Sequence, residues 1–144
     1  MKNNPFFIDH NQPFDTLPFN EFKTEHFLPA IHEAIKISNV KIESICNCNE
    51  EASFDNTILE LETSHEDLQR IVGVYWHLFG AHSEGDFKKL AQEISPIISS
   101  HTNDYMLNAT LFKRIKDVYD NRSNMNYDEH DLKLIEDTHQ AFIR

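Results

Sequence analysis

Apolar side chains recur at alternating steps of three and four residues along most of this chain. The first row consists of Leu28, Ile31, Ile35, Ser38, Ile42 and Ile45. The second row consists of Phe54, Ile58, Leu61, His65, Leu68, Val72, Tyr75 and Phe79. Such steps place the side chains on one face of an α-helix. The rows therefore predict two long helices, the second with a length of about 40 Å.

Residues suited to capping a helix precede both rows. Thr24 stands before the first row and is followed by Glu25, and Ser53 or Asp55 stands before the second. The polar segment "CNCNEEAS" at 46–53 separates the two rows. Because two long helices joined by a short loop tend to pack side by side, we expect a long antiparallel helical hairpin.

About three further helices are expected after the hairpin. The third helix has apolar positions at Phe87, Leu90, Ile94, Ile97, Ile98 and His101, and Pro96 predicts a kink or break in it. The next has Leu107, Leu111, Ile115 and Val118, and the last has Leu132, Ile135, His139 and Phe142. Asn126 and Glu129 resemble a capping box that starts the last helix. With only three glycines, turn signals are too sparse for an all-β chain, so the expected fold is all-α.

The first 22 residues lack any helical or strand period. They contain five phenylalanines and three prolines, which are Phe6, Phe7, Phe14, Phe19, Phe22, Pro5, Pro13 and Pro18. Proline favours extended backbone, and exposed Phe side chains gain free energy on leaving water. We therefore predict an extended N-terminal arm over 1–22 that packs on other parts of the protein, followed by a helical domain over 23–144.

The end of the chain gives no helix-stop signal. The last row continues to Arg144 without a Gly or Pro to end the helix. We therefore expect the natural polypeptide to continue beyond residue 144.

The overall charge excludes some classes of partner. The formal net charge of −11 repels phosphate backbones and anionic lipid headgroups, so no nucleic acid is expected as a partner. The longest mainly apolar run, at 71–81, is too short to span a bilayer, so no membrane is expected either. The N-terminus lacks the apolar region of a secretory signal, which predicts a cytoplasmic protein or a periplasmic one whose signal has been removed.

Two His–Glu pairs resemble the start of a zinc-peptidase motif, but neither completes it. Such a motif needs a second His four residues after the first, so that both imidazoles lie on one helix face beside a Glu base. After His32 and Glu33 the fifth position is Lys36. After His65 and Glu66 it is Gln69. Neither pair is expected to bind a metal, and His65 lies on an apolar row where a buried structural role is commoner.

Other chemical motifs are weak or missing. Cys46 and Cys48 form a lone C-x-C, which is half of a four-ligand zinc set, so a structural or incidental role is expected. The nine histidines are scattered, and neither a nucleophile elbow nor a phosphate-binding loop is present in the sequence. The aromatic run "VYWHLF" at 74–79 could line a peptide groove, but core packing is the favoured role.

Four segments carry a resemblance to a known family. They are "NPFF" at 4–7, "LPFNEFKTEHFLPAIHEAI" at 17–35, "SFDNTILELE" at 53–62 and "EISPIISSHTNDYMLNATLFKRIKDVY" at 93–119. The first three resemble the opening of the thimet-oligopeptidase family of zinc metallopeptidases, in which a PF..I..EH..PA stretch precedes a W/F-x-N-T stretch. The fourth is similar to the peptidyl-dipeptidase branch of that family.

The resemblance implies the N-terminal helical domain of a zinc-dependent peptidyl-dipeptidase, which walls the channel that admits short peptides. The HExxH helix, the third zinc-ligand Glu and the Tyr and His that stabilise the transition state would lie beyond residue 144. The implied cofactor is zinc in the parent enzyme and none in these residues, and the implied partners are the downstream catalytic domain and an oligopeptide substrate. No catalytic, cofactor-binding or metal-binding residue is therefore assigned here, and the chain alone is expected to be inactive.

Two alternatives use the same sequence features. A freestanding helical protein-interaction module would show the same apolar rows. A small metal-binding protein would use the scattered histidines and the C-x-C.

Overall fold

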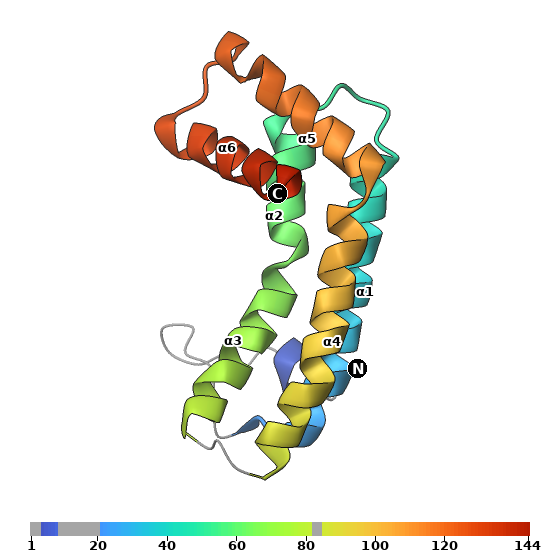
Figure 1. The fold of residues 1–144 in the computed structure, drawn as a ribbon, viewed down its shortest axis with the longest axis vertical. Coiled ribbons are helices and arrows are strands. Elements are labelled where there is room, and N and C mark those ends of the chain that lie inside the picture. Colours follow the sequence, from blue (N-terminus) through green and yellow to red (C-terminus); the bar gives the residue numbers. More distant parts are fainter. Residues whose placement is uncertain (1–3, 9–20, 82–84) are drawn as a thin grey trace. The chain divides into compact units, whose positions relative to one another are not determined.

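The computed structural model describes residues 4–8, 21–81 and 85–144, and every regular element in these ranges is helical (Figure 1). The elements are η1 (Pro5–Phe7), α1 (Thr24–Cys46), η4 (Phe54–Leu59), α2 (Glu60–Ser64), α3 (Glu66–Ala81), α4 (Asp86–Met106), α5 (Ala109–Asn121), η5 (Arg122–Asn124) and α6 (Glu129–Ile143). The prediction of an all-α fold is confirmed.

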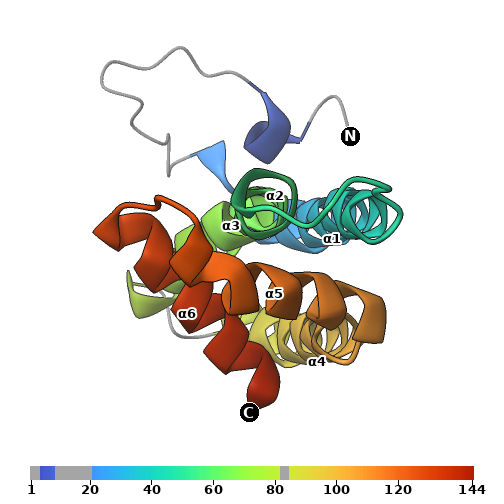
Figure 2. The same cartoon turned by 90° about the horizontal axis from the view of Figure 1, so that it is seen from above.

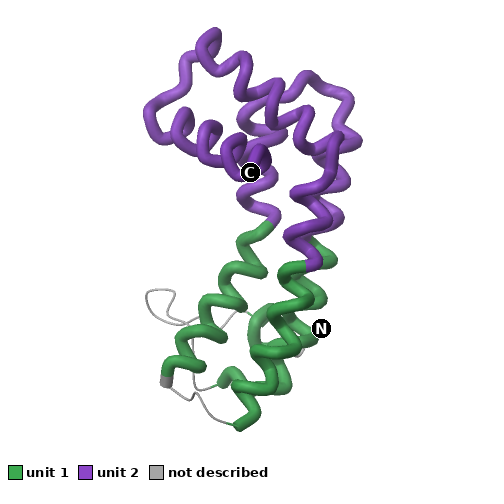
Figure 3. Tube along the Cα trace, viewed as in Figure 1, with its two compact units in different colours: residues 1–37, 65–99 green, residues 38–64, 100–144 purple. Residues whose placement is uncertain are grey.

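The chain divides into two compact units, each with a hydrophobic core of its own (Figure 3). Unit 1 comprises residues 1–37 and 65–99, and unit 2 comprises residues 38–64 and 100–144. One boundary between the units falls inside α1, after residue 37, and another falls inside α4, after residue 99. Each of these two helices therefore contributes side chains to both cores. The division into an arm over 1–22 and a helical domain over 23–144 stays a prediction.

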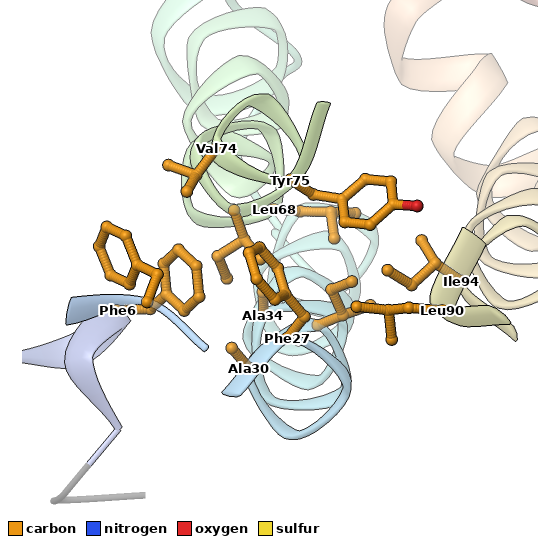
Figure 4. Packing of buried hydrophobic residues seen from close by; sticks show 12 residues of the cluster. Phe6, Phe27, Ala30, Ala34, Leu68, Val74, Tyr75, Leu90 and Ile94 are labelled. Atoms are coloured by element: carbon orange, nitrogen blue, oxygen red, sulfur yellow. The ribbon is translucent and has the colours of Figure 1, made fainter. Parts of the chain in front are cut away.

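The core of unit 1 is formed by one face each of α1, α3 and α4 (Figure 4). Its buried members on these helices are Phe27, Ala30, Ile31, Ala34, Leu68, Ile71, Val74, Tyr75, Leu90 and Ile94. Leu28 and Ile35 of the predicted first row are only partly buried beside this cluster. The buried face of α1 therefore includes Phe27, Ala30 and Ala34, which lie beside the predicted row, as well as Ile31 of that row. This is expected because the apolar face of a helix in a globular protein is wider than one row of residues.

The described part of the N-terminal arm packs on helices α1 and α3 within unit 1, where the Phe6 ring lies 5.2 Å from that of Phe27. Pro5–Phe7 form a 3-10 helix in place of the expected extended backbone, and Asn4 caps it by accepting a hydrogen bond from the Phe6 amide. The Phe6 ring stacks on Phe22 at a centroid distance of 4.2 Å. The Phe6 carbonyl also accepts a hydrogen bond of 2.8 Å from Arg70. Phe14 and Phe19, which the prediction also includes, lie outside the described residues.

The second apolar row does not form the single long helix expected over Phe54–Phe79. The backbone forms a wide π-type turn over η4, continues as α2, and is interrupted at His65 before α3 begins. Just before the interruption, the Ser64 hydroxyl donates to the Leu61 carbonyl at 2.6 Å, and the Thr63 hydroxyl donates to the Glu60 carbonyl at 3.1 Å. Hydroxyl groups that bond nearby carbonyls offer the backbone an alternative to the helical ladder and bend helices.

The core of unit 2 joins the end of α1 to η4, α2, α5 and α6. Figure 2 shows α5 and α6 lying side by side, and both also contact η4. The buried members are Ile42, Ile45, Ile58, Leu61, Leu111, Ile115, Val118 and Ile135.

Several predicted helix ends are shifted. Ser53 caps η4 with a full capping box, as one of the two predicted alternatives. The last helix is capped by Asp128, whose side chain accepts from the Asp131 amide, so the prediction of Asn126 as its cap is wrong. Leu107 lies in a turn and is 83% exposed, so its predicted place on a helix seam is also wrong. Helix α4 runs through Pro96 without a break.

Candidate functional site

The first His–Glu pair lies on the solvent side of α1. His32 and Lys36 are exposed, whereas the adjacent Ile31 and Ala34 are buried in the core of unit 1. Lys36 stands where a zinc-peptidase helix carries its second His. Because an ammonium group repels a metal cation, this face of α1 does not fit a zinc site.

The second His–Glu pair lies at the interruption between α2 and α3. His65 is half-buried, and its backbone carbonyl accepts a hydrogen bond of 2.9 Å from the Gln69 amide. Within residues 4–8, 21–81 and 85–144, the structure shows no group of three or more His, Cys, Asp and Glu side chains that could hold a metal ion. His10 and His82 lie outside the described residues, so the absence of metal ligands from the chain stays a prediction.

The side chain of Asn56, from the "SFDNT" segment, makes four hydrogen bonds. Its side-chain oxygen accepts from the Ser53 amide at 2.8 Å, the Thr57 hydroxyl at 2.8 Å and an Arg114 Nη at 3.0 Å. Its side-chain nitrogen donates to the Glu51 carbonyl at 2.9 Å. A half-buried polar side chain that bonds several backbone and side-chain groups fixes the local backbone. Asn56 thus fixes the start of η4.

Arg114 of α5 bonds the segment between α1 and η4. One of its Nη atoms donates to the carbonyls of Cys48 and Glu50, each at 3.1 Å, and the other donates to Asn56. A guanidinium group can do this because it carries five N–H donors in a fixed planar fork. We call Asn56, Arg114 and the carbonyls of residues 48, 50 and 51 the loop clamp. Asn56 lies in the first turn of η4, and Arg114 lies in α5, 58 residues further along the chain.

The loop clamp was missed by sequence reasoning. Asn56 and Arg114 both lie in segments that carry the family resemblance, yet nothing in the periodicity of either segment pairs them. One sequence signal could have indicated Arg114, because it is a charged residue directly beside Ile115 in the apolar row of Leu111, Ile115 and Val118.

A shallow groove in unit 2 adjoins Cys46 at the end of α1. It is lined by Asn39, Ile42, Glu43, Cys46, Asp104, Tyr105 and Asn108. Asn108 caps α5 by accepting from the Leu111 amide at 3.0 Å, and its side-chain oxygen lies 3.8 Å from the Cys46 sulfur. Cys46 and Cys48 are both free thiols. The expected structural or incidental role of this C-x-C stays a prediction.

Burial raises the pKa of the Cys46 thiol, and this effect outweighs the opposing hydrogen bond to Asn108 and the positive charge of Arg114. We expect the pH profile of Cys46 alkylation by iodoacetamide to shift to higher pH in the folded chain than in urea, because the thiolate is the reacting form. The folded-state pKa lies above the unfolded one, so the linked stability is present below the unfolded pKa and is lost as pH rises through the folded pKa.

Mass spectrometry of a Cys48→Ser variant measures this profile for Cys46 alone. Comparing midpoints, and not rates at one pH, separates the pKa effect from simple shielding of the sulfur. Coincident midpoints in the folded and unfolded chains would contradict the prediction.

Comparison with known proteins agrees with the resemblance. No protein-family model matches the chain. The chain is 31% identical over 143 residues to the dipeptidyl carboxypeptidase of Salmonella typhimurium, and 30% identical over 140 residues to that of Escherichia coli. These alignments cover 99% and 97% of this chain, but 21% of each relative. The chain is a relative of the dipeptidyl carboxypeptidases. It spans about a fifth of their length.

This relationship confirms the resemblance to the peptidyl-dipeptidase branch of the thimet-oligopeptidase family. Two of the segments that carry the resemblance supply structural contacts in unit 2. The third segment contributes Asn56 and the fourth contributes Asn108 and Arg114, and all three side chains bond backbone groups or each other. Asn56 and Arg114 thus fix the loop before η4, and Asn108 caps α5.

The aromatic run at 74–79 divides between core and surface. Val74 and Tyr75 are buried, and the Tyr75 hydroxyl donates to the Phe87 carbonyl at 2.8 Å. Trp76 is 53% exposed. The prediction of core packing is thus confirmed for Val74 and Tyr75 and wrong for Trp76.

Among the described residues, no helix is both long enough and apolar enough to cross a membrane.

Proposed function

We propose that this chain is the N-terminal helical part of a longer zinc-dependent peptidyl-dipeptidase, and that it helps to shape the channel through which oligopeptides reach the catalytic part. The observation that carries the proposal is the extent of the alignment. Nearly the whole chain matches only 21% of the Salmonella typhimurium relative. Such a match is what one part of a larger enzyme gives.

The roles of the described residues support a scaffold. Both cores are built from apolar faces of several helices, and the loop clamp fixes the loop at 47–53 between α1 and η4. Neither His–Glu pair fits a zinc site. Zinc in such an enzyme polarises the scissile carbonyl and activates water, and we propose that the residues that hold it lie in the remainder of the parent.

A comparison of the 144-residue chain with the full-length protein tests the proposal. We expect the full-length protein to release dipeptides from the carboxyl end of an unblocked oligopeptide, and to lose this activity on chelation. We expect the 144-residue chain to release none, even with zinc supplied, because the metal-binding helix is outside it. Mass spectrometry of the products measures both.

A full-length variant with the Glu of its HExxH motif replaced by Gln is the control for contaminating peptidases. Turnover by the pure 144-residue chain would refute the proposal. So would a full-length protein that carries no HExxH motif and releases no dipeptides.

A freestanding helical interaction module is the second candidate, and the exposed Trp76 favours it. The two candidates differ in the natural reading frame. A module predicts a stop near Arg144, whereas the peptidase predicts several hundred further residues that include HExxH.

We propose the cytoplasm as the location of the parent enzyme, with the periplasm as the alternative if a signal peptide has been removed. Cell fractionation followed by detection of the full-length protein distinguishes the two.

A further inference from the structure

The solvent side of α3 changes character along the helix. Near its start the exposed residues are Glu66, Gln69 and Arg70. From residue 71 to residue 81 the sequence contains no Lys, Arg, Asp or Glu. Among residues 71–80 the exposed ones are Gly73, Trp76, His77 and Gly80, which we call the α3 outer face. The solvent side of an amphipathic helix normally carries charged and polar residues.

Trp76 is held in place on this face by aromatic neighbours. Its ring contacts the rings of Tyr75 and Phe79 edge-on, at centroid distances of 5.1 Å and 5.6 Å. More than half of its surface nevertheless remains exposed. An exposed Trp on a helical stretch without charged residues matches the centre of a protein interface, where aromatic residues are enriched and charged residues are depleted.

Gly73 and Gly80 flank Trp76 at three and four residues along the helix. Glycine inside a helix is less favourable than alanine. A Cβ atom placed at either position would meet nothing within 4 Å among the described residues, so packing within that part of the chain does not require these glycines. Glycine does allow another backbone to approach a helix closely. The two glycines thus agree with a partner that covers the face around Trp76.

The length of the relatives indicates which partner this is. They are nearly five times as long as the stretch that aligns with this chain. Two copies of the chain would bring together net charges of −11, which opposes self-association. An extended substrate peptide needs polar partners for its backbone, and the α3 outer face has His77 as its one polar side chain.

From the exposed Trp76, the lack of charge and the flanking glycines, we infer that the α3 outer face is the surface on which a part of the parent polypeptide outside these 144 residues packs. Trp76 is the anchor of that contact, and Gly73 and Gly80 admit the approaching backbone. This inference rests on the proposed function, because it requires a longer parent chain.

Photo-crosslinking of the full-length protein tests the inference. A benzophenone amino acid replaces Trp76 in one sample and Lys113 in the control, since the Lys113 side chain is 77% exposed in unit 2. We expect crosslinks from position 76 to residues outside 1–144, and far fewer from position 113. Crosslinks from position 76 only to residues 9–20, only to a second copy, or to no protein residue would overturn the inference.

Substitution of the two glycines gives a second test, in which the sign of the change in Tm is compared between the 144-residue chain and the full-length protein. In the 144-residue chain, Gly73→Gln and Gly80→Gln together are expected to leave the Tm unchanged or raise it by about 2–4 °C, because Gln is the better helix former. In the full-length protein the same variant is expected to have a lower Tm, because the longer side chains block the contact. The matched control, Ala141→Gln, places the same side chain on an exposed position of α6. An equal, non-negative shift in both proteins would overturn the inference.

Dipeptide release is measured on the same full-length samples. If dipeptides are released but position 76 gives no crosslink outside 1–144, the packing inference fails and the proposed function stands. If the crosslink forms and no dipeptide is released, the proposed function fails and the packing inference stands.

Discussion

Replacing Phe27 by alanine is expected to lower the free energy of unfolding by about 3–5 kcal/mol, the usual loss for a fully buried Phe. Phe27 has no exposed surface. Its ring lies 5.2 Å from that of Phe6, 5.6 Å from that of Tyr75 and 6.3 Å from that of Phe87. The substitution therefore opens a cavity where the arm, α1, α3 and α4 meet.

The fluorescence of Trp76 reports the unfolding of unit 1 and so measures this loss of stability. Trp76 is the one tryptophan of the chain and packs against Tyr75 of the same core. Urea unfolding followed by Trp fluorescence should show a midpoint well below that of the unsubstituted chain. The control Leu107→Ala removes a side chain that is 83% exposed, and should change stability by less than about 0.5 kcal/mol. Equal midpoints for Phe27→Ala and Leu107→Ala would contradict the packing of Phe27.

Replacing Asn56 by alanine is expected to cost about 3 kcal/mol, the second-largest effect. The change leaves the Ser53 amide, the Thr57 hydroxyl and one Arg114 Nη without their shared acceptor. Buried donors that lose their partner cost about 1–3 kcal/mol, and more when the donor is charged. Urea unfolding followed by far-UV circular dichroism measures the loss.

The matched control for Asn56→Ala is Asn121→Ala. Asn121 is exposed, and its side chain makes one hydrogen bond, to the Asp117 carbonyl, among the contacts seen in the described residues. We expect a change within about 0.5 kcal/mol for the control. A double-mutant cycle with Arg114→Met should then give a coupling of about 1 kcal/mol or more with Asn56→Ala. Additive losses would show that the loop clamp is not one cooperative network.

The location of the helices was predictable because helical periodicity is a local property. The rows that begin at Leu28, Phe87 and Leu132 each fall on a helix of the structure, since steps of three and four residues favour that backbone wherever they occur. The Ser53 cap was predictable for the same reason, because its partner Asn56 lies three residues away.

The candidate site was less predictable than the helices. The sequence argues against His32 and Glu33 as a zinc motif, since Lys36 occupies the ligand position, and this absence of a metal site stays a prediction. It did not indicate that Asn56 and Arg114 bond each other, because no rule of spacing links two residues so far apart. It also favoured core packing for the whole run at 74–79, because periodicity alone does not show that α3 turns Trp76 away from the core.

The all-helical fold was predictable from residue spacing within short segments, and the relation to the peptidyl-dipeptidases from the resemblance of four such segments to that family. The long-range hydrogen bond between Asn56 and Arg114 and the exposure of Trp76 became visible in the folded chain alone. The interruption of the second apolar row at His65 is local, beside the hydroxyl–carbonyl bonds of the two preceding residues, but the row of apolar residues continues through it and gave no sign of it. The physical reason is that a periodic row fixes which backbone forms, whereas burial and long-range hydrogen bonds depend on which faces the folded chain brings together.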